Sequence, residues 1–148
     1  MTRTSTDTGL LIIRIIFGVI LTAHGFQKLF LIGPGQVGET FSQISSLPAP
    51  GIMAWIAILV ELLGGLALIV GIATRIAAAA AALVMAGAMV TVHLGNGFFS
   101  MDGGIEYTLM LTAVGVALVL TGAGRFSLDA KLERGTREQA ATVHTTQE

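Results

Sequence analysis

The sequence feature that most constrains the fold is the apolar stretch 10–32, LLIIRIIFGVILTAHGFQKLFLI. It is longer than the roughly 20 residues with which a helix crosses the hydrocarbon core of a bilayer. Within it stand four polar groups that hydrocarbon solvates poorly, Arg14, His24, Gln27 and Lys28. A polar side chain at membrane depth needs a partner or a water-filled cavity, so these groups predict contacts with other parts of the chain.

The overall composition is that of an integral membrane protein. Of its 148 residues, 53% are hydrophobic and 11% are charged, and its mean hydropathy is +0.82. In a soluble domain about a quarter of the residues are charged. Apolar runs cover residues 10–32, 52–72, 76–94 and 105–121. The first run is too long for the apolar core of a signal peptide and contains Arg14, so we interpret it as a retained helix. The sequence predicts an all-α integral membrane four-helix bundle over residues 1–129.

The connections between the runs differ in length and character. Gly33-Pro34-Gly35 ends the first run, because these residues interrupt helices. The segment 36–47 has apolar residues at helical spacing, and it forms either a short helix lying in the membrane interface or a polar loop. The turn 73–75 is so tight that its two helices must be antiparallel neighbours. Residues 130–148 form a charged tail that we expect to be disordered after about Arg137.

Charge predicts the orientation. Four crossings put both termini and the 73–75 turn on one side, which holds Arg3, Arg75, Arg125, Lys131, Arg134 and Arg137. The other side has one cation, Lys28, near a helix end, beside Glu39, Asp102 and Glu106. Because cytoplasmic loops carry the excess of Lys and Arg, both termini are predicted to be cytoplasmic, in a multi-pass protein of the plasma membrane.

The polar groups of the four runs form a predicted ladder. At a rise of about 1.5 Å per residue, they descend from the outer rim to the bilayer centre in the order His93, Glu106, Lys28, His24, Glu61. Helical spacing groups residues that we expect to have structural roles in helix contacts and turns: Arg14, Gly18 and Gly25 on the first run, Gly64 and Gly65 beside Glu61 on the second, and Arg75 in the turn. Arg14 lies nearer the inner end and could extend to the cytoplasmic interface.

This pattern resembles the DoxX family of small four-helix membrane proteins over roughly residues 10–129. The residues that carry the resemblance are Arg14, Gly18, His24-Gly25, Lys28, Glu61, Gly64-Gly65, Gly71, Thr74-Arg75, His93, Gly104, Glu106, Gly122 and Gly124–Asp129. The resemblance implies the four-helix fold. Some family members are similar to subunits of quinone-linked sulfur oxidoreductases, and others resemble proteins tied to quinone or oxidative-stress resistance.

Binding of a quinone is one function that the polar groups of the ladder could serve. A membrane quinone site needs an apolar slot open to lipid, with proton donors and acceptors near a membrane face, and histidines and desolvated carboxylates suit that task. We therefore interpret His24, His93 and Glu106 as candidate proton donors or acceptors, and Lys28 and Glu61 as candidate ligands of a quinone. A structural interpretation competes with this one. In it, Arg14 or Lys28 pairs with Glu61 to fix helix register, with Arg14 the favoured partner, and the outer groups face water.

Other cofactors find less support in the sequence. The chain has no cysteine, which removes disulfides, thiolate metal sites and thiol redox chemistry. A bis-histidine haem b needs both histidines at one depth, whereas His24 and His93 are separated by about seven residues, or ~10 Å. The same spread argues against a metal site, and we predict none. No basic and aromatic stripe is present, so no nucleic-acid partner is expected.

Three functions remain open. The first is a quinone-binding or membrane-anchor subunit of an oxidoreductase, in which a soluble partner supplies the redox centre that this chain lacks. The second is a non-enzymatic membrane scaffold or assembly factor for partner proteins. The third is a small proton or solute transporter, which would require a homo-oligomer because four helices enclose little lumen. All three place the chain among membrane lipids.

Overall fold

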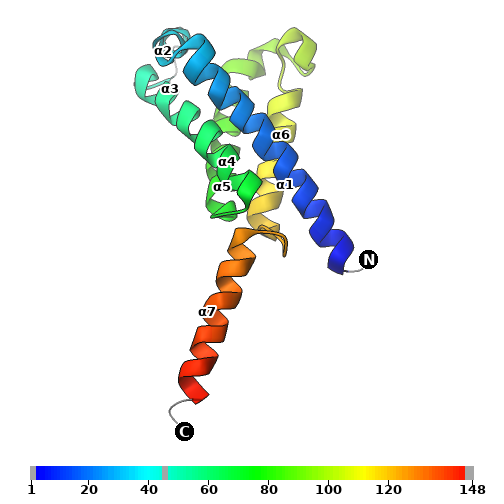
Figure 1. The fold of residues 1–148 in the computed structure, drawn as a ribbon. Coiled ribbons are helices and arrows are strands. Elements are labelled where there is room, and N and C mark those ends of the chain that lie inside the picture. Colours follow the sequence, from blue (N-terminus) through cyan, green and yellow to red (C-terminus); the bar gives the residue numbers. More distant parts are fainter. Residues whose placement is uncertain (1–2, 45–46, 146–148) are drawn as a thin grey trace.

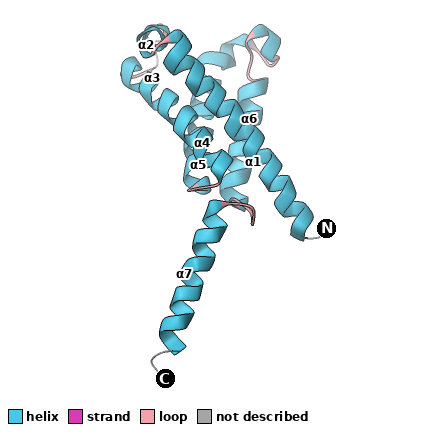
Figure 2. Cartoon of the chain, in the orientation of Figure 1, coloured by secondary structure: helices cyan, strands magenta, loops and turns pink. Residues whose placement is uncertain are grey.

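The computed structural model describes residues 3–44 and 47–145, and every regular element in these ranges is a helix (Figure 2). The all-helical prediction is therefore confirmed. Three helices are long and apolar enough to cross a membrane: Thr4–Ile32, Pro50–Val70 and Thr74–Asn96. The fourth apolar run forms a shorter helix, α6 (Glu106–Thr121), of 16 residues.

The first long helix consists of α1 (Arg3–Phe26) and a π-helical end, η1 (Gln27–Ile32). Gly33 stops it by adopting a positive φ of 88°, and its N–H bonds to the carbonyl of Lys28 at 3.1 Å. The 36–47 segment contributes to a helix rather than a polar loop: α2 (Pro34–Ser42) begins on a proline, and Val37 is buried. Proline suits a first helical position because its missing N–H would have no partner there.

The second and third long helices also contain π-helical segments. The second is α3 (Pro50–Leu59), η2 (Val60–Gly64) and α4 (Gly65–Val70). The third is α5 (Thr74–Ala88), η3 (Met89–His93) and a 3₁₀ turn, η4 (Leu94–Asn96). A second 3₁₀ turn, η5 (Ser100–Asp102), precedes α6, and α7 (Leu128–Thr145) follows it.

Small residues let the long helices approach backbone to backbone. A Cβ on Gly18 would lie 2.7 Å from the carbonyl oxygen of Gly65, and a Cβ on Gly25 would lie 2.5 Å from the nitrogen of Leu62. Gly115 of α6 packs in the same way against Ala82 of α5. Without a hydrophobic driving force between helices in lipid, close packing of this kind holds a bundle together. The enclosed core consists of Phe17, Leu21, Leu68, Ala77, Ala78, Ala81, Met85, Leu111 and Leu118.

The segment that charge predicts to be a tail forms helix α7 in the described part of the chain. It runs to Thr145 and projects away from the bundle (Figure 1). Its start is capped, because the Ser127 hydroxyl accepts the N–H of Ala130 at 3.1 Å, and Ala, Glu, Lys and Arg along it favour helix. The charge along this segment is therefore compatible with a helix.

We call the end of the bundle that carries residues 3–9, 71–74 and 122–130 the terminal end, and the end that carries α2 and residues 94–105 the loop end (Figure 1). At the terminal end Arg14 is 1% exposed and does not extend to solvent. Its guanidinium donates to the carbonyl oxygens of Ala123 at 3.2 Å and Phe126 at 2.8 Å. Gly71, at φ 76°, leaves room for this group, because a Cβ there would overlap the guanidinium.

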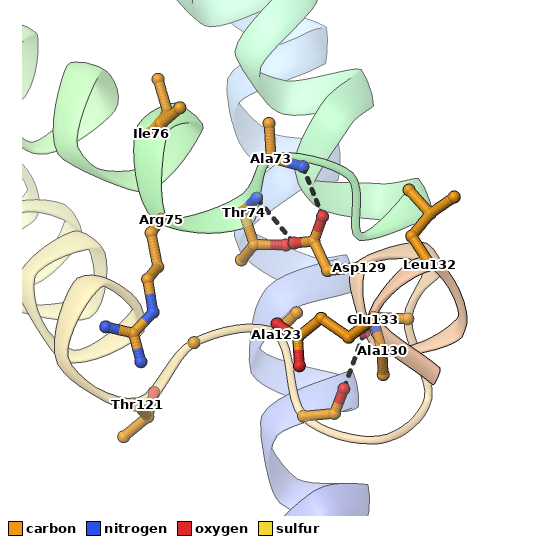
Figure 3. Close-up of a pocket in the computed structure, with 13 residues that line it drawn as sticks. Ala73, Thr74, Arg75, Ile76, Thr121, Ala123, Asp129, Ala130, Leu132 and Glu133 are labelled. Carbon is orange, nitrogen blue, oxygen red and sulfur yellow. Dashed lines mark hydrogen bonds between the residues drawn. The ribbon is translucent and has the colours of Figure 1, made fainter. Parts of the chain in front are cut away.

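Asp129 closes the same end. Its carboxylate accepts the backbone N–H groups of Ala73 at 2.7 Å and Thr74 at 2.9 Å, and thereby caps α5 from another segment (Figure 3). Burial by itself would raise the pKa of Asp129. The hydrogen bonds from Thr74 and Ala73 and the charge of Arg14 outweigh it and hold that pKa below its usual value.

We expect Gly25→Ala to destabilise the fold by about 1–3 kcal/mol, since the new methyl group would overlap the backbone of Leu62. Gly9→Ala in the same helix is the matched control, because nothing lies within 4 Å of its added Cβ. Thermal unfolding of both variants in detergent tests this. Equal effects at the two positions would contradict the close approach of α1 to η2.

Asp129→Asn should cost about 0.5–2 kcal/mol at neutral pH, the usual range for loss of a helix cap. Because the folded pKa of Asp129 lies below the unfolded value of about 4, its stabilisation is complete above that pH. It is lost as the pH falls through the folded pKa. Thermal unfolding at neutral pH and at about pH 3 should therefore show the gap between wild type and variant shrinking in acid. A gap that does not change with pH would exclude the carboxylate charge as its cause.

Candidate functional site

A cavity of about 400 Å³ opens near the loop end, between the first three long segments of the chain. Its walls are mainly apolar, with Phe41, Ile44, Leu47, Met53, Ile56, Ala57, Leu83, Val84, Gly87, Ala88 and Val92 among the lining residues. Three ionisable side chains also line it, Lys28, Glu61 and His93. An apolar cavity with a few convergent polar groups is the usual form of a small-molecule site.

An ion pair forms one part of the lining. The ammonium of Lys28 donates to Oε1 of Glu61, which joins η1 to η2. Glu61 is 2% exposed and Lys28 24% exposed, so the pair lies largely inside the protein. The other carboxylate oxygen, Oε2, is buried and has no partner within the described ranges 3–44 and 47–145. An unpaired buried acceptor is costly, so Oε2 is the carboxylate oxygen that still lacks a donor.

This pairing corrects one sequence interpretation. Arg14, the favoured partner of Glu61 in the structural interpretation, instead bonds to two carbonyls at the terminal end. Lys28, the other candidate, takes the carboxylate. Both cations lie on one face of the first helix. The register in which that helix packs against the second one brings Lys28 to Glu61 and Arg14 to Gly71.

Each ionisable lining residue lies in a π-helical segment: Lys28 in η1, Glu61 in η2 and His93 in η3. π-Helical turns are rare and occur frequently at functional sites. Here three separate helices change to π geometry around one cavity. Sequence reasoning missed this feature, because no residue pattern marks a π turn apart from a polar group inside an apolar run.

His93 is held by the loop that follows it. Its Nδ1 lies 2.7 Å from the carbonyl oxygen of Gly103. Since a carbonyl only accepts, Nδ1 must carry the proton. In the neutral ring Nε2 then has the free lone pair and can accept a proton. Asn96 donates to the same carbonyl at 3.3 Å, which further fixes the loop.

The structure does not bring His24 and Glu106 to this cavity. His24 is exposed, its Nδ1 bonds to the carbonyl of Ile20 at 2.9 Å, and its ring centre lies 6.1 Å from that of Tyr107. Glu106 is exposed at the start of α6 and accepts from the N–H and hydroxyl of Ser100. The five-residue ladder therefore divides into a cavity group of three and two separate side chains.

The residues expected to have structural roles lie elsewhere. Gly18, Gly25 and Gly65 lie at the contact between α1 and the second long helix, and Gly64 has only an ordinary contact with Ala77 at 3.9 Å. Arg75 is exposed at the start of α5 and lines a separate cavity of about 660 Å³ at the terminal end (Figure 3).

The lining suits some ligands and not others. Because His93 lines the cavity and His24 does not, this site lacks the facing pair of imidazoles that a bis-histidine haem requires. Within the described residues no three His, Asp or Glu side chains gather as metal ligands. The lining does suit a small apolar ring that carries hydrogen-bonding oxygens.

Comparison with known proteins places the chain in a family. The DoxX family model matches residues 9–94, more than half of the sequence. The Bacillus subtilis protein named "Putative oxidoreductase CatD" is 33% identical over 90% of this chain and 93% of its own length. An uncharacterised membrane protein of Mycobacterium tuberculosis is 28% identical, over 82% of this chain and 80% of its own. The Escherichia coli inner membrane protein YqjF is 30% identical, over 86% and 95%. No solved structure matches the chain. With its family model and its CatD-like relative in agreement, this protein belongs to the DoxX family.

Proposed function

We propose that this protein is a quinone-binding subunit of a plasma-membrane oxidoreductase, with a soluble partner that supplies the redox centre. The observation that carries the proposal is the apolar cavity in which three π-helical segments place Lys28, Glu61 and His93. The proposal includes α6 as a fourth membrane crossing, with both termini in the cytoplasm, in keeping with the cations that gather at the terminal end.

The size and chemistry of the cavity support a quinone ring. Its volume of about 400 Å³ falls within the range of small-molecule sites. The Lys28 ammonium can donate to a ring carbonyl, and the free Oε2 of Glu61 can accept from a ring hydroxyl. When bound, a quinone supplies two-electron, two-proton chemistry. The chain's own contribution is to hold the ring, exclude water with apolar walls and exchange a proton at Nε2 of His93.

A soluble partner is part of the proposal for a chemical reason. The sequence has no cysteine for a thiol or iron–sulfur centre, so electron transfer needs a bound cofactor or a partner, and the proposal assigns the electron carrier to a partner protein. The relative from Bacillus subtilis bears the name of an oxidoreductase, which supports this class of function. A membrane scaffold without quinone is the second candidate, and it is favoured by α7, which projects from the bundle where a partner could dock (Figure 1).

A photoreactive quinone analogue should label the residues of the cavity in protein purified with native lipid. His93→Asn should reduce labelling several-fold, because it removes a cavity-lining imidazole. His24→Asn is the matched control and should label like wild type, because His24 lies outside the lining. Peptide mass analysis locates the label. If no quinone is found in the purified protein and the label is not located at residues of the cavity, the scaffold would be the better candidate.

The Lys28–Glu61 pair should behave as a coupled unit. Glu61→Gln alone or Lys28→Gln alone leaves the partner charge buried without its counter-ion, and each should cost about 3–5 kcal/mol. The double variant should cost less than the sum of the two, as a double-mutant cycle of unfolding in detergent would show. Strictly additive losses would mean that the two side chains do not interact.

A further inference from the structure

A cavity of about 520 Å³ at the terminal end lies outside the proposed quinone site. Three cations and three large apolar residues line it, Arg125, Lys131 and Arg134 with Val70, Phe126 and Leu128. The linker between α6 and α7 supplies Arg125 and Phe126, and the first turns of α7 supply Leu128, Lys131 and Arg134, three residues apart and so on one face of that helix.

The cations are incompletely neutralised. Arg125 has one acidic neighbour, Asp7, at 3.9 Å between Nε and Oδ2, and its guanidinium lies 5.5 Å from the ring centre of Phe126. Arg134 donates weakly, at 3.5 Å, to the carbonyl of Arg125. Lys131 has no ion pair or hydrogen bond from its side chain with the described part of the chain. The cavity thus has a positive excess that an anion would balance.

The two acids at the start of α7, Asp129 and Glu133, do not line this cavity. Asp129 and Glu133 line the other cavity of the terminal end, beside Thr74 and Arg75 (Figure 3). Lys131 and Arg134 line this one. No carboxylate belongs to its lining. One side of α7 is therefore basic where it meets the bundle, and the other is acidic.

The position of the cavity specifies what kind of anion fits. Val70 is the last residue of the second membrane-length helix, so the cavity lies where that helix leaves the apolar layer. Val70, Phe126 and Leu128 are each between 38% and 49% exposed beside the cations. A ligand that carries both a phosphate and an apolar body would satisfy both halves of this surface, whereas a free ion would leave the apolar half uncovered.

We propose that this cavity binds the headgroup of an anionic phospholipid. The phosphate lies among Arg125, Lys131 and Arg134, and the glycerol and first acyl carbons pack on Val70, Phe126 and Leu128. Arginine suits this role because its planar fork bonds to two phosphate oxygens at once. Basic residues next to a membrane helix attract anionic lipid in general. The cavity in addition provides a specific binding site for the headgroup.

The test uses the whole protein reconstituted in bilayers of equal parts phosphatidylglycerol and phosphatidylcholine. After mild extraction, native mass spectrometry measures which lipids remain bound. Wild type should retain phosphatidylglycerol in preference to phosphatidylcholine. The double variant Lys131→Gln and Arg134→Gln should lower that preference by about fivefold for each cation removed. Both side chains are exposed, so the variant should unfold at the same temperature as wild type.

Arg75→Gln is the matched control, since Arg75 is an exposed cation at the same end that lines the other cavity. It should keep the preference of wild type. Three results would overturn the proposal: equal retention of the two lipids by wild type, an equal loss in Arg75→Gln, or displacement of the bound lipid by millimolar inorganic phosphate. The last would identify a site for a free ion rather than for a lipid.

Discussion

The buried ion pair between Lys28 and Glu61 is the interaction on which the loop-end half of the molecule depends. Each of these charges would be strongly unfavourable alone between apolar helices, so each requires the other. Their contact is possible because Gly25, one turn before Lys28, lets α1 touch the backbone of η2. Since Glu61 also lines the cavity, the contact that joins the helices also forms part of the candidate site.

At the terminal end, a second buried charge is stabilised in a different way. Arg14 lies as deeply buried as Glu61, yet its partners are backbone carbonyls of the α6–α7 linker rather than a carboxylate. Gly71 provides the space, and Asp129 holds the adjoining turn through two backbone N–H groups. This network ties α1, the α6–α7 linker, the α4–α5 turn and the start of α7 together. The two ends differ in consequence: the cavities of the terminal end are lined by exposed charged side chains, whereas the cavity near the loop end has mainly apolar walls around a buried ion pair.

Local sequence patterns did not determine which cation pairs with Glu61. Helical spacing placed Arg14 and Lys28 on one face, and depth placed Glu61 between them, so either cation could have been its partner. The choice between them depends on the register of two packed helices, which the close approaches of Gly18 to Gly65 and of Gly25 to Leu62 set and which no pattern within one helix specifies. The same limit applies to His24. It is one helical turn from Lys28, but it lies beside Tyr107 rather than in the cavity.

The sequence by itself determined the helical class, the apolar segments, the family resemblance and the identity of the polar groups that need partners. These properties follow from composition and from the period of a helix, which are local. Only the tertiary structure decided that Lys28, Glu61 and His93 line one cavity while His24 and Glu106 do not, and that three helices become π-helical around it. It also decided that the start of α7 places Asp129 and Glu133 at one cavity and Lys131 and Arg134 at another. Those outcomes depend on how helices cross and on which backbone groups remain unpaired, and both are set by contacts between residues distant in the chain.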